Sequence, residues 1–419
     1  MTPTTFTKEN LDRLRSSGRV SGVLLLSANS YEGITDPPAQ YSDDQSCPNQ
    51  GASIYSSSSC SITKPWNAAG QNTLFENWPF PIVLLNNIDT ISYLIDSCYK
   101  KFNVPIDTAK WPLCAIEIDA NMLQAVDSET CLRRNDFFSI SGQVKHCDKM
   151  GDLNVFMLQS PPLAKEENKI YPQKSVIVVT TKLDMVNLFD KFEIGSDSPT
   201  TGIVVLLAVA SMLSDISKET KFKPGVSNVL YAFLNGESFD YIGSSKFVYD
   251  MQESKFPPSS NDTSKITDAT KIESGKINEE KESLIWPKIN LPSLKFVLEL
   301  GQLNTQGSEL YAHVDTHFDK DDWPLVDNLI RSAEKYSVNI ENSSNTQRGL
   351  PPSSIQSILK ERNVTGIFLS NFDSDYINTY YHGPYDNFTL LGVYNKEKGP
   401  DQPIVKKLSN GNTIFHISI

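Results

Sequence analysis

Residues 233–245 read FLNGESFDYIGSS and contain the side chains best placed for chemistry. They follow an apolar run, residues 228–232, that we expect to form a strand. Zinc peptidases of α/β fold keep a Glu-Glu pair at the mouth of such a strand, where one glutamate activates a water molecule and the other binds the metal. Here the pair is Glu237 and Ser238, so the position of the metal-binding carboxylate holds a hydroxyl.

A dinuclear zinc site in such a fold also needs a His-x-Asp motif after one strand and a histidine late in the chain. Lys182 stands at the first histidine position, and a protonated lysine is repelled by zinc. Asp184, which would support that histidine, is present. His382 is the one residue of a ligand type, and one ligand in five cannot hold zinc.

The other ligand positions hold residues without a carboxylate. Ser198 stands where a helix would begin with a bridging aspartate, and Asp197, one residue off, is expected to point elsewhere. Gly301 stands near the acid position after a later strand, with Glu299 two residues early. We therefore expect no metal, no other cofactor and no catalytic residue.

Three of these candidates have a second interpretation. His382 is a metal ligand or, more simply, a hydrogen-bonded histidine. Glu237 is a solvated surface carboxylate or, because α/β folds place ligand crevices at the carboxyl ends of strands, part of a pocket. Asp184 is structural if it pairs with Lys182 or with a backbone amide.

The elements that position these residues begin at about residue 170, where apolar β-branched runs alternate with amphipathic helices. Strands are expected at residues 175–180, 229–234, 296–300 and 366–369. The helix expected over residues 201–217 is apolar around nearly its whole circumference, so we expect it to be buried against the sheet. This pattern predicts an α/β lobe over residues 151–419, with a mostly parallel sheet covered by helices on both faces.

Residues 257–283 interrupt this lobe without ending it. They have almost no large apolar side chains and are rich in Lys, Glu, Ser and Thr. Such a segment cannot bury enough surface to offset the entropy of ordering, so we interpret it as a flexible surface insertion.

The pattern along residues 1–150 predicts a smaller lobe of mixed structure. Strand candidates at residues 22–26 and 81–85 lie among loops rich in Ser, Asn and Pro, and all six cysteines fall in this region. Six free thiols would leave the even count and the clustering unexplained. Consecutive pairing would close short loops, each contributing roughly 3 kcal/mol. The predicted pairs are Cys47–Cys60, Cys98–Cys114 and Cys131–Cys147.

Composition bounds the compartment and the partners. The 419 residues have a net charge of -12 and no basic stripe, which argues against nucleic acid. The sequence has no apolar run long enough to span a membrane, and its first residues do not resemble a signal peptide. Four N-glycosylation sequons, together with the cysteines, favour a secreted or lumenal domain. They begin at Asn261, Asn342, Asn363 and Asn387.

Several motifs resemble one family. Residues 239–246, FDYIGSSK, with VYDM at 248–251, resemble the Asp-Tyr-Ile-Gly-Ser region of the nicastrin family. Other stretches agree in order over roughly residues 45–390: CPN at 47–49, WN at 66–67, FPI at 80–82, CLRR at 131–134, TKLD at 181–184, ELGQ at 299–302 and YY at 380–381.

The resemblance implies a small lobe packed on a large lobe similar to zinc aminopeptidases and the transferrin receptor ectodomain. Members of the family have one C-terminal membrane span, so we expect this chain to be an ectodomain with N-linked glycans on the extracellular or lumenal side. The resemblance also implies a non-catalytic receptor of γ-secretase, acting with a presenilin-type protease and the other subunits in intramembrane proteolysis and Notch signalling. Its substrates would be type I membrane protein stubs whose ectodomains have been shed.

Two explanations for the selection of short stubs stay open. Glu237, with Asp240 and Tyr241 in the same turn, would bind the stub's α-amino group, and an exposed ion pair of this kind contributes about 0.2–1 kcal/mol, at most roughly fivefold in affinity. A steric gate would exclude bulky ectodomains more strongly, with residues 47–66, including Trp66, as a candidate lid. An active lumenal zinc aminopeptidase and a dead peptidase that binds a soluble ligand are the alternative classes.

Overall fold

The computed structural model describes residues 1–27, 54, 65–74, 76–104, 113–118, 129, 133, 151–159, 170–189, 195–219, 227–258, 287–304, 309–315, 323–344 and 349–386. Outside these ranges lie most of the candidate lid, the expected insertion after residue 258, and Cys47, Cys60, Cys131, Cys147, Asn261 and Asn387. Across the described ranges, no helix combines the length and the apolar character that a membrane span requires.

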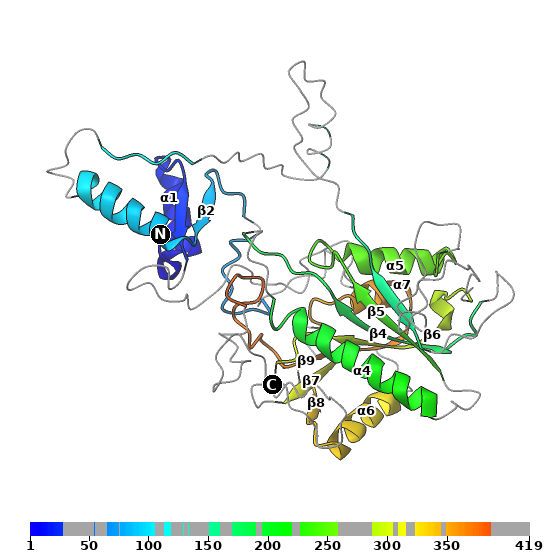
Figure 1. The fold of residues 1–419 in the computed structure, drawn as a ribbon. Coiled ribbons are helices and arrows are strands. Elements are labelled where there is room, and N and C mark those ends of the chain that lie inside the picture. Colours follow the sequence, from blue (N-terminus) through cyan, green and yellow to red (C-terminus); the bar gives the residue numbers. More distant parts are fainter. Residues whose placement is uncertain are drawn as a thin grey trace, which may run out of the picture.

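A seven-stranded sheet forms the centre of the larger lobe (Figure 1). In spatial order its strands are β3 (Val155–Leu158), β5 (Asn228–Leu234), β4 (Val176–Lys182), β6 (Leu294–Leu300), β9 (Thr365–Ser370), β7 (Leu310–Val314) and β8 (Ile340–Asn342). The central strands β5, β4, β6 and β9 are parallel, whereas β3 and β7 pair antiparallel with their inner neighbours. The predicted α/β lobe with a mostly parallel sheet is confirmed, and the four strands expected from the sequence are the four central ones.

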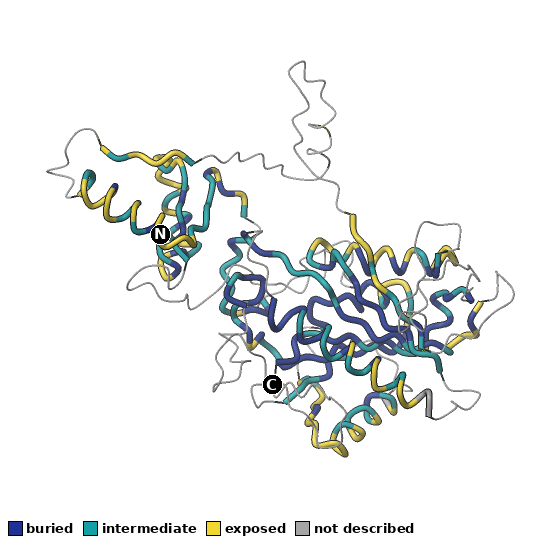
Figure 2. Tube along the Cα trace, viewed as in Figure 1, coloured by how far each residue is buried: buried dark blue, intermediate teal, exposed yellow. Residues whose placement is uncertain are grey.

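Successive residues of a strand point to opposite sides of the sheet, so the apolar central strands present two apolar faces. Helices cover both of these faces. α5 (Ile242–Gln252) and α7 (Ile355–Glu361) pack on one face, in the cluster that contains Val178. α4 (Thr200–Glu219) and α6 (Trp323–Lys335) pack on the other, in the cluster that contains Val179. Figure 2 shows the central strands as a buried layer between the helices.

α4 is the helix expected over residues 201–217, but it is not buried all round. Leu206 and Ala210 pack in the core, whereas the side chains of Leu207 and Met212 are 54% and 53% exposed. The expectation that this helix is buried against the sheet is therefore confirmed for one side of it. A helix that lies on a single sheet buries one stripe of its surface, however apolar its other side is.

The smaller lobe contains a second sheet, in which β1 (Val23–Leu26) and β2 (Ile82–Leu85) pair in parallel. Its core includes Phe6, Leu11, Trp78 and also Phe189, which follows β4 in the chain. This contact ties the start of the larger lobe to the smaller one. The domain boundary expected near residue 150 stays a prediction.

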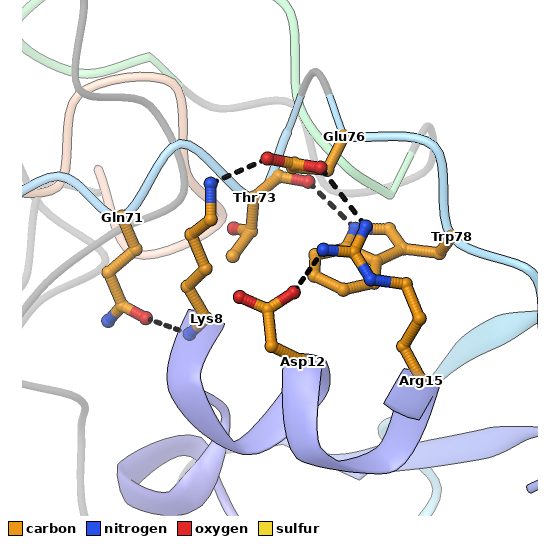
Figure 3. Close-up of polar contacts among 7 residues, drawn as sticks. All are labelled: Lys8, Asp12, Arg15, Gln71, Thr73, Glu76 and Trp78. Atoms are coloured by element: carbon orange, nitrogen blue, oxygen red, sulfur yellow. Dashed lines mark hydrogen bonds and ion pairs between the residues drawn. The ribbon is translucent and has the colours of Figure 1, made fainter. Parts of the chain in front are cut away.

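The helix α1 (Lys8–Ser17) is held against the segment that follows residue 70, after a short 3₁₀ turn, η1 (Pro3–Thr5). Figure 3 shows Lys8 and Arg15 both reaching Glu76, with nitrogen–oxygen distances of 2.5 and 3.3 Å. The Arg15 guanidinium also lies 5.0 Å from the centre of the Trp78 ring. These contacts are structural and lie in the smaller lobe.

A disulfide joins Cys98, in the helical segment η2 (Tyr93–Asn103) that continues α2 (Ile88–Ser92), to Cys114. The Cα atoms of the two residues are 5.4 Å apart. Asn103 strengthens the same junction, because its side chain both donates to the Cys114 carbonyl and accepts from the Cys114 amide at 2.9 Å. This pair agrees with the consecutive pairing, and the other two pairs stay predictions.

Candidate functional site

A small cavity lies at the carboxyl ends of the central strands. After β4 the chain adds β5 on one side and β6 on the other, so this edge includes a topological switch point, where open α/β sheets place their ligand sites. The cavity volume is about 40 Å³. Because one water molecule needs about 10–15 Å³, there is room for a few waters and not for a peptide. Candidates from the sequence that line the cavity are Lys182, Ser198, Glu237, Ser238, Tyr241, Glu299, Gly301 and His382.

Glu237 lies in the turn between β5 and α5 and is only 2% exposed. Its Oε1 accepts a hydrogen bond of 2.6 Å from the amide of Ser244, in the first turn of α5, where a carboxylate is favoured by the free amides of the helix. Its Oε2 has no hydrogen-bond partner among the described residues. The interpretation of Glu237 as a solvated surface carboxylate is therefore wrong, because the turn directs the side chain inward.

Burial raises the pKa of Glu237 to about 7. The hydroxyl groups of Ser354 and Ser244 and the amide of Ser244 act in the opposite direction, and the charge of Asp184 adds to the rise. The side chain therefore holds its proton at a pH where an exposed glutamate is ionised.

Asp184 holds this turn in place from the end of β4. Its Oδ1 accepts from the amide of Glu237 at 2.9 Å, and its Oδ2 accepts from the amide of Ser238 at 2.8 Å. Of the two structural roles considered for Asp184, the structure shows the contact with backbone amides. Lys182 instead donates from its ammonium group to the hydroxyl of Tyr381 at 2.8 Å and lies 4.7 Å from the centre of that ring.

Glu299 is a residue whose role sequence reasoning missed. It lies in β6, is 3% exposed, and accepts hydrogen bonds from the amides of Ser354 and Ile355 at 3.0 and 2.7 Å. It therefore fixes the loop that leads into α7. Burial raises the pKa of Glu299 to about 7, and the nearby Glu237 carboxyl contributes to the rise. A charged residue inside an otherwise apolar strand was the available signal.

Gly301 cannot be replaced by a metal ligand without rearrangement. A Cβ atom at this position would lie 2.3 Å from the Phe368 ring, which covers it from β9. Close packing of the ring on the glycine thus occupies the place that a carboxylate would need.

Asp197 and Asp386 form a second buried pair of acids, beside the cavity rather than in its lining. Asp197 accepts from the amide of Asn304 at 3.0 Å and from the Asn371 side chain at 3.2 Å, whereas Ser198 lies in the lining. Asp386 accepts from the amide of Asp197 at 3.0 Å. Burial raises the pKa of Asp197 to about 7 and that of Asp386 to about 6, and mutual repulsion adds to the rise for Asp197.

His382 is 7% exposed and stacks on Tyr381, with ring centres 3.8 Å apart. Neither ring nitrogen has a hydrogen-bond partner among the described residues, so the expectation of a hydrogen-bonded histidine is wrong for this part of the chain. Burial, helped by the charge of Lys182, lowers the pKa of His382 well below its usual value. The ring is therefore neutral and is held by packing.

The described residues contain no group of three or more His, Cys, Asp or Glu side chains arranged to hold a metal ion. We expect elemental analysis of the dialysed protein to find far less than one zinc per chain and assays to find no aminopeptidase turnover. The reason is that Asp184, Glu237, Glu299 and Asp197 already accept from backbone amides. One or two zinc ions per chain, together with turnover, would show an active peptidase instead.

The turn that follows Glu237 has an uncommon backbone. Asp240 and Tyr241 have φ angles of 62° and 51°, in the left-handed region, and Tyr241 directly precedes α5. Tyr241 lines the cavity, whereas Asp240 is exposed and partial burial raises its pKa. A substrate-binding role for either residue stays a prediction.

Trp66, expected in the lid, is completely buried in an aromatic cluster with Phe368, Phe372, Tyr376 and Tyr381. Its carbonyl accepts from the amide of Tyr376 at 2.8 Å. Tyr376, Tyr381 and Phe368 also line the cavity, so Trp66 packs behind one of its walls. Asn342 and Asn363, the asparagines of two sequons, are exposed.

Known proteins resemble the whole chain. The family models of the nicastrin small lobe and the nicastrin large lobe match residues 1–124 and 175–414. Human nicastrin is 28% identical over 95% of this chain and 53% of its own length, and nicastrin of Caenorhabditis elegans is 27% identical over 88% and 52%. A crystal structure of the gamma-secretase component nicastrin matches with a TM-score of 0.57 at 22% identity, over 92% of this chain and 66% of that one, which shows a shared fold.

The chain spans about half the length of the curated relatives it matches. The two lobe models follow one another along it and together cover most of its residues. The chain belongs to the nicastrin family.

Proposed function

We propose that this chain is the non-catalytic, substrate-admitting ectodomain of a γ-secretase complex, and that it selects short membrane-protein stubs by size. Its membership of the nicastrin family supports a place in that complex. Its partners would be a presenilin-type protease and the other subunits, on the extracellular or lumenal side of the membrane. Asp184 and Glu299 support a non-catalytic role, because backbone amides occupy both carboxylate oxygens of each residue.

The observation that carries the steric mechanism is the small volume of the cavity. A stub's amino terminus would need to enter a volume of about 40 Å³ to reach Oε2 of the buried Glu237, which has no hydrogen-bond partner among the described residues. The contribution of about 0.2–1 kcal/mol expected for an exposed ion pair does not apply to the buried Glu237 carboxyl. The pocket must open before an ammonium group can reach this carboxyl. We therefore place the selection at the surface around the cavity, where the size of the stub's ectodomain decides.

Blocking the stub's amine tests this mechanism against direct binding by Glu237. In the assembled complex, we expect acetylated and free stubs of equal length to be cleaved at rates within about fivefold of each other. Glu237→Ala is expected to lower cleavage through assembly or stability, to the same extent for both stubs. Glu334→Ala, at an exposed glutamate of α6, is the matched control.

Direct binding of the stub's amine by Glu237 predicts a different result from the same four measurements. If acetylation has a large effect in the wild type that disappears in Glu237→Ala, the amine and the carboxylate are partners of one interaction. The steric mechanism would then be wrong, and Glu237 would be a binding residue.

A further inference from the structure

Two buried acidic residues line the same cavity, and the charge of one acts on the other. Glu237 comes from the end of β5 and Glu299 from β6, and both side chains are almost fully inaccessible to solvent. When one of these carboxyl groups is ionised, the other binds its proton more tightly, because two buried carboxylates at one site cannot both be charged without a large cost in free energy. One proton is therefore expected between them near neutral pH.

The hydrogen bonds decide which residue holds that proton. Both oxygens of Glu299 accept from backbone amides, an arrangement that favours the ionised form. Glu237 uses only Oε1, for the Ser244 amide, and its Oε2 has no partner in the described part of the chain. The Ser354 hydroxyl lies near both carboxyls, and its Oγ likewise makes no hydrogen bond to a described residue. The proton thus belongs on Oε2 of Glu237.

We propose that this proton on Glu237 is a latch that keeps the cavity closed, and that its loss opens the walls formed by the turn before α5 and the loop before α7. Ionised, Glu237 would lie beside the Glu299 carboxylate with space for only a few waters. Separation of the two walls relieves this repulsion by admitting solvent. The latch rests on the cavity and does not depend on what the protein admits.

Other charged and titratable groups around Glu237 do not replace this role. Asp184 lies behind the turn, where two amides hold it, and Lys182 is engaged with Tyr381. His382 lines the same cavity, and its lowered pKa keeps it neutral as Glu237 titrates. Tyr241 completes the lining on the side of α5.

The sign of the pH dependence follows from the raised pKa of Glu237, about 7 in the folded protein against 4.5 for an ordinary glutamate. The closed form binds this proton more tightly than the unfolded chain does. Its stabilising effect is complete below pH 4.5 and is lost as the pH rises through about 7. Mild acid therefore closes the latch, and neutral to alkaline pH releases it.

Glu237→Gln tests the latch with the whole chain, because its amide imitates the protonated carboxyl and can donate to Ser354. Chemical denaturation between about pH 5 and about pH 8 should show wild-type stability falling relative to the variant, by up to about tenfold in the unfolding constant per pH unit. Hydrogen exchange of the Ser244, Ser354 and Ile355 amides should accelerate over the same range in the wild type more than in Glu237→Gln. Glu334→Gln, the same substitution at an exposed glutamate of α6, should follow the wild type.

Parallel pH profiles of the wild type and Glu237→Gln would overturn the proposal, since the Asp197 and Asp386 pair titrates in a similar range and is common to both. If the variant does not fold, carbon-13 NMR of the wild-type carboxyl groups decides. A Glu237 titration midpoint near pH 7 supports the latch, and one near 4.5 overturns it.

Discussion

Cleavage of a membrane-protein stub is expected to fall by more than about tenfold when its ectodomain is lengthened from a short tail to a folded domain. A tenfold change corresponds to only about 1.4 kcal/mol. Overlap between two folded surfaces costs more than this, because close-packed proteins have low compressibility. The measurement is the cleavage rate of stubs graded in ectodomain length, made with the complete protein assembled with a presenilin-type protease.

Glu237→Ala distinguishes the gate from a carboxylate receptor in the same series. Under steric selection the variant changes the overall rate, while the ratio between short and long stubs stays as in the wild type. A rate that is independent of length in the wild type would contradict the proposed function. It would leave the proton latch untouched, because the latch is measured on the isolated chain.

Trp66→Ala is expected to have the second large effect, a loss of roughly 3–5 kcal/mol in the free energy of unfolding. Trp66 is completely buried, and its ring lies 5.9 Å from that of Phe372 and edge-on to that of His313 at 6.0 Å. Removal of the indole leaves a void behind the wall formed by Tyr376 and Tyr381. Denaturant titration of the wild type and the variant measures the loss.

Two further variants make this result specific. Trp66→Phe should lose less stability because it fills most of the void, and Tyr336→Ala, at a 76% exposed aromatic residue, should change stability by no more than about 0.5 kcal/mol. If Trp66→Ala is as stable as the wild type, the aromatic cluster does not support the cavity wall. Where the variant folds, the steric gate also predicts a weaker dependence of cleavage on ectodomain length.

Residue types alone predicted much of the site and of the lobe around it. The continuous apolar runs of β4, β5, β6 and β9 can be buried only in a covered parallel sheet, so strand pattern and fold class follow from local sequence. Lys182, Ser238 and Gly301 could be assigned as unsuitable zinc ligands because the chemistry of a ligand depends on its side chain. To locate the zinc-ligand positions in the sequence, only the order of the strands and helices along the chain was needed.

Only the tertiary structure decided which side chains of the site lie close together and how deeply each is buried. Glu237 and Glu299 belong to strands that β4 separates, and Asp197 and Asp386 are 189 residues apart in the chain. Strand order and loop paths bring these acids together, and neither is encoded in a local periodicity. The burial of Glu237, the neutral state of His382 and the exposed side of α4 have the same origin: solvent access is a property of the packed elements, and no single segment determines it.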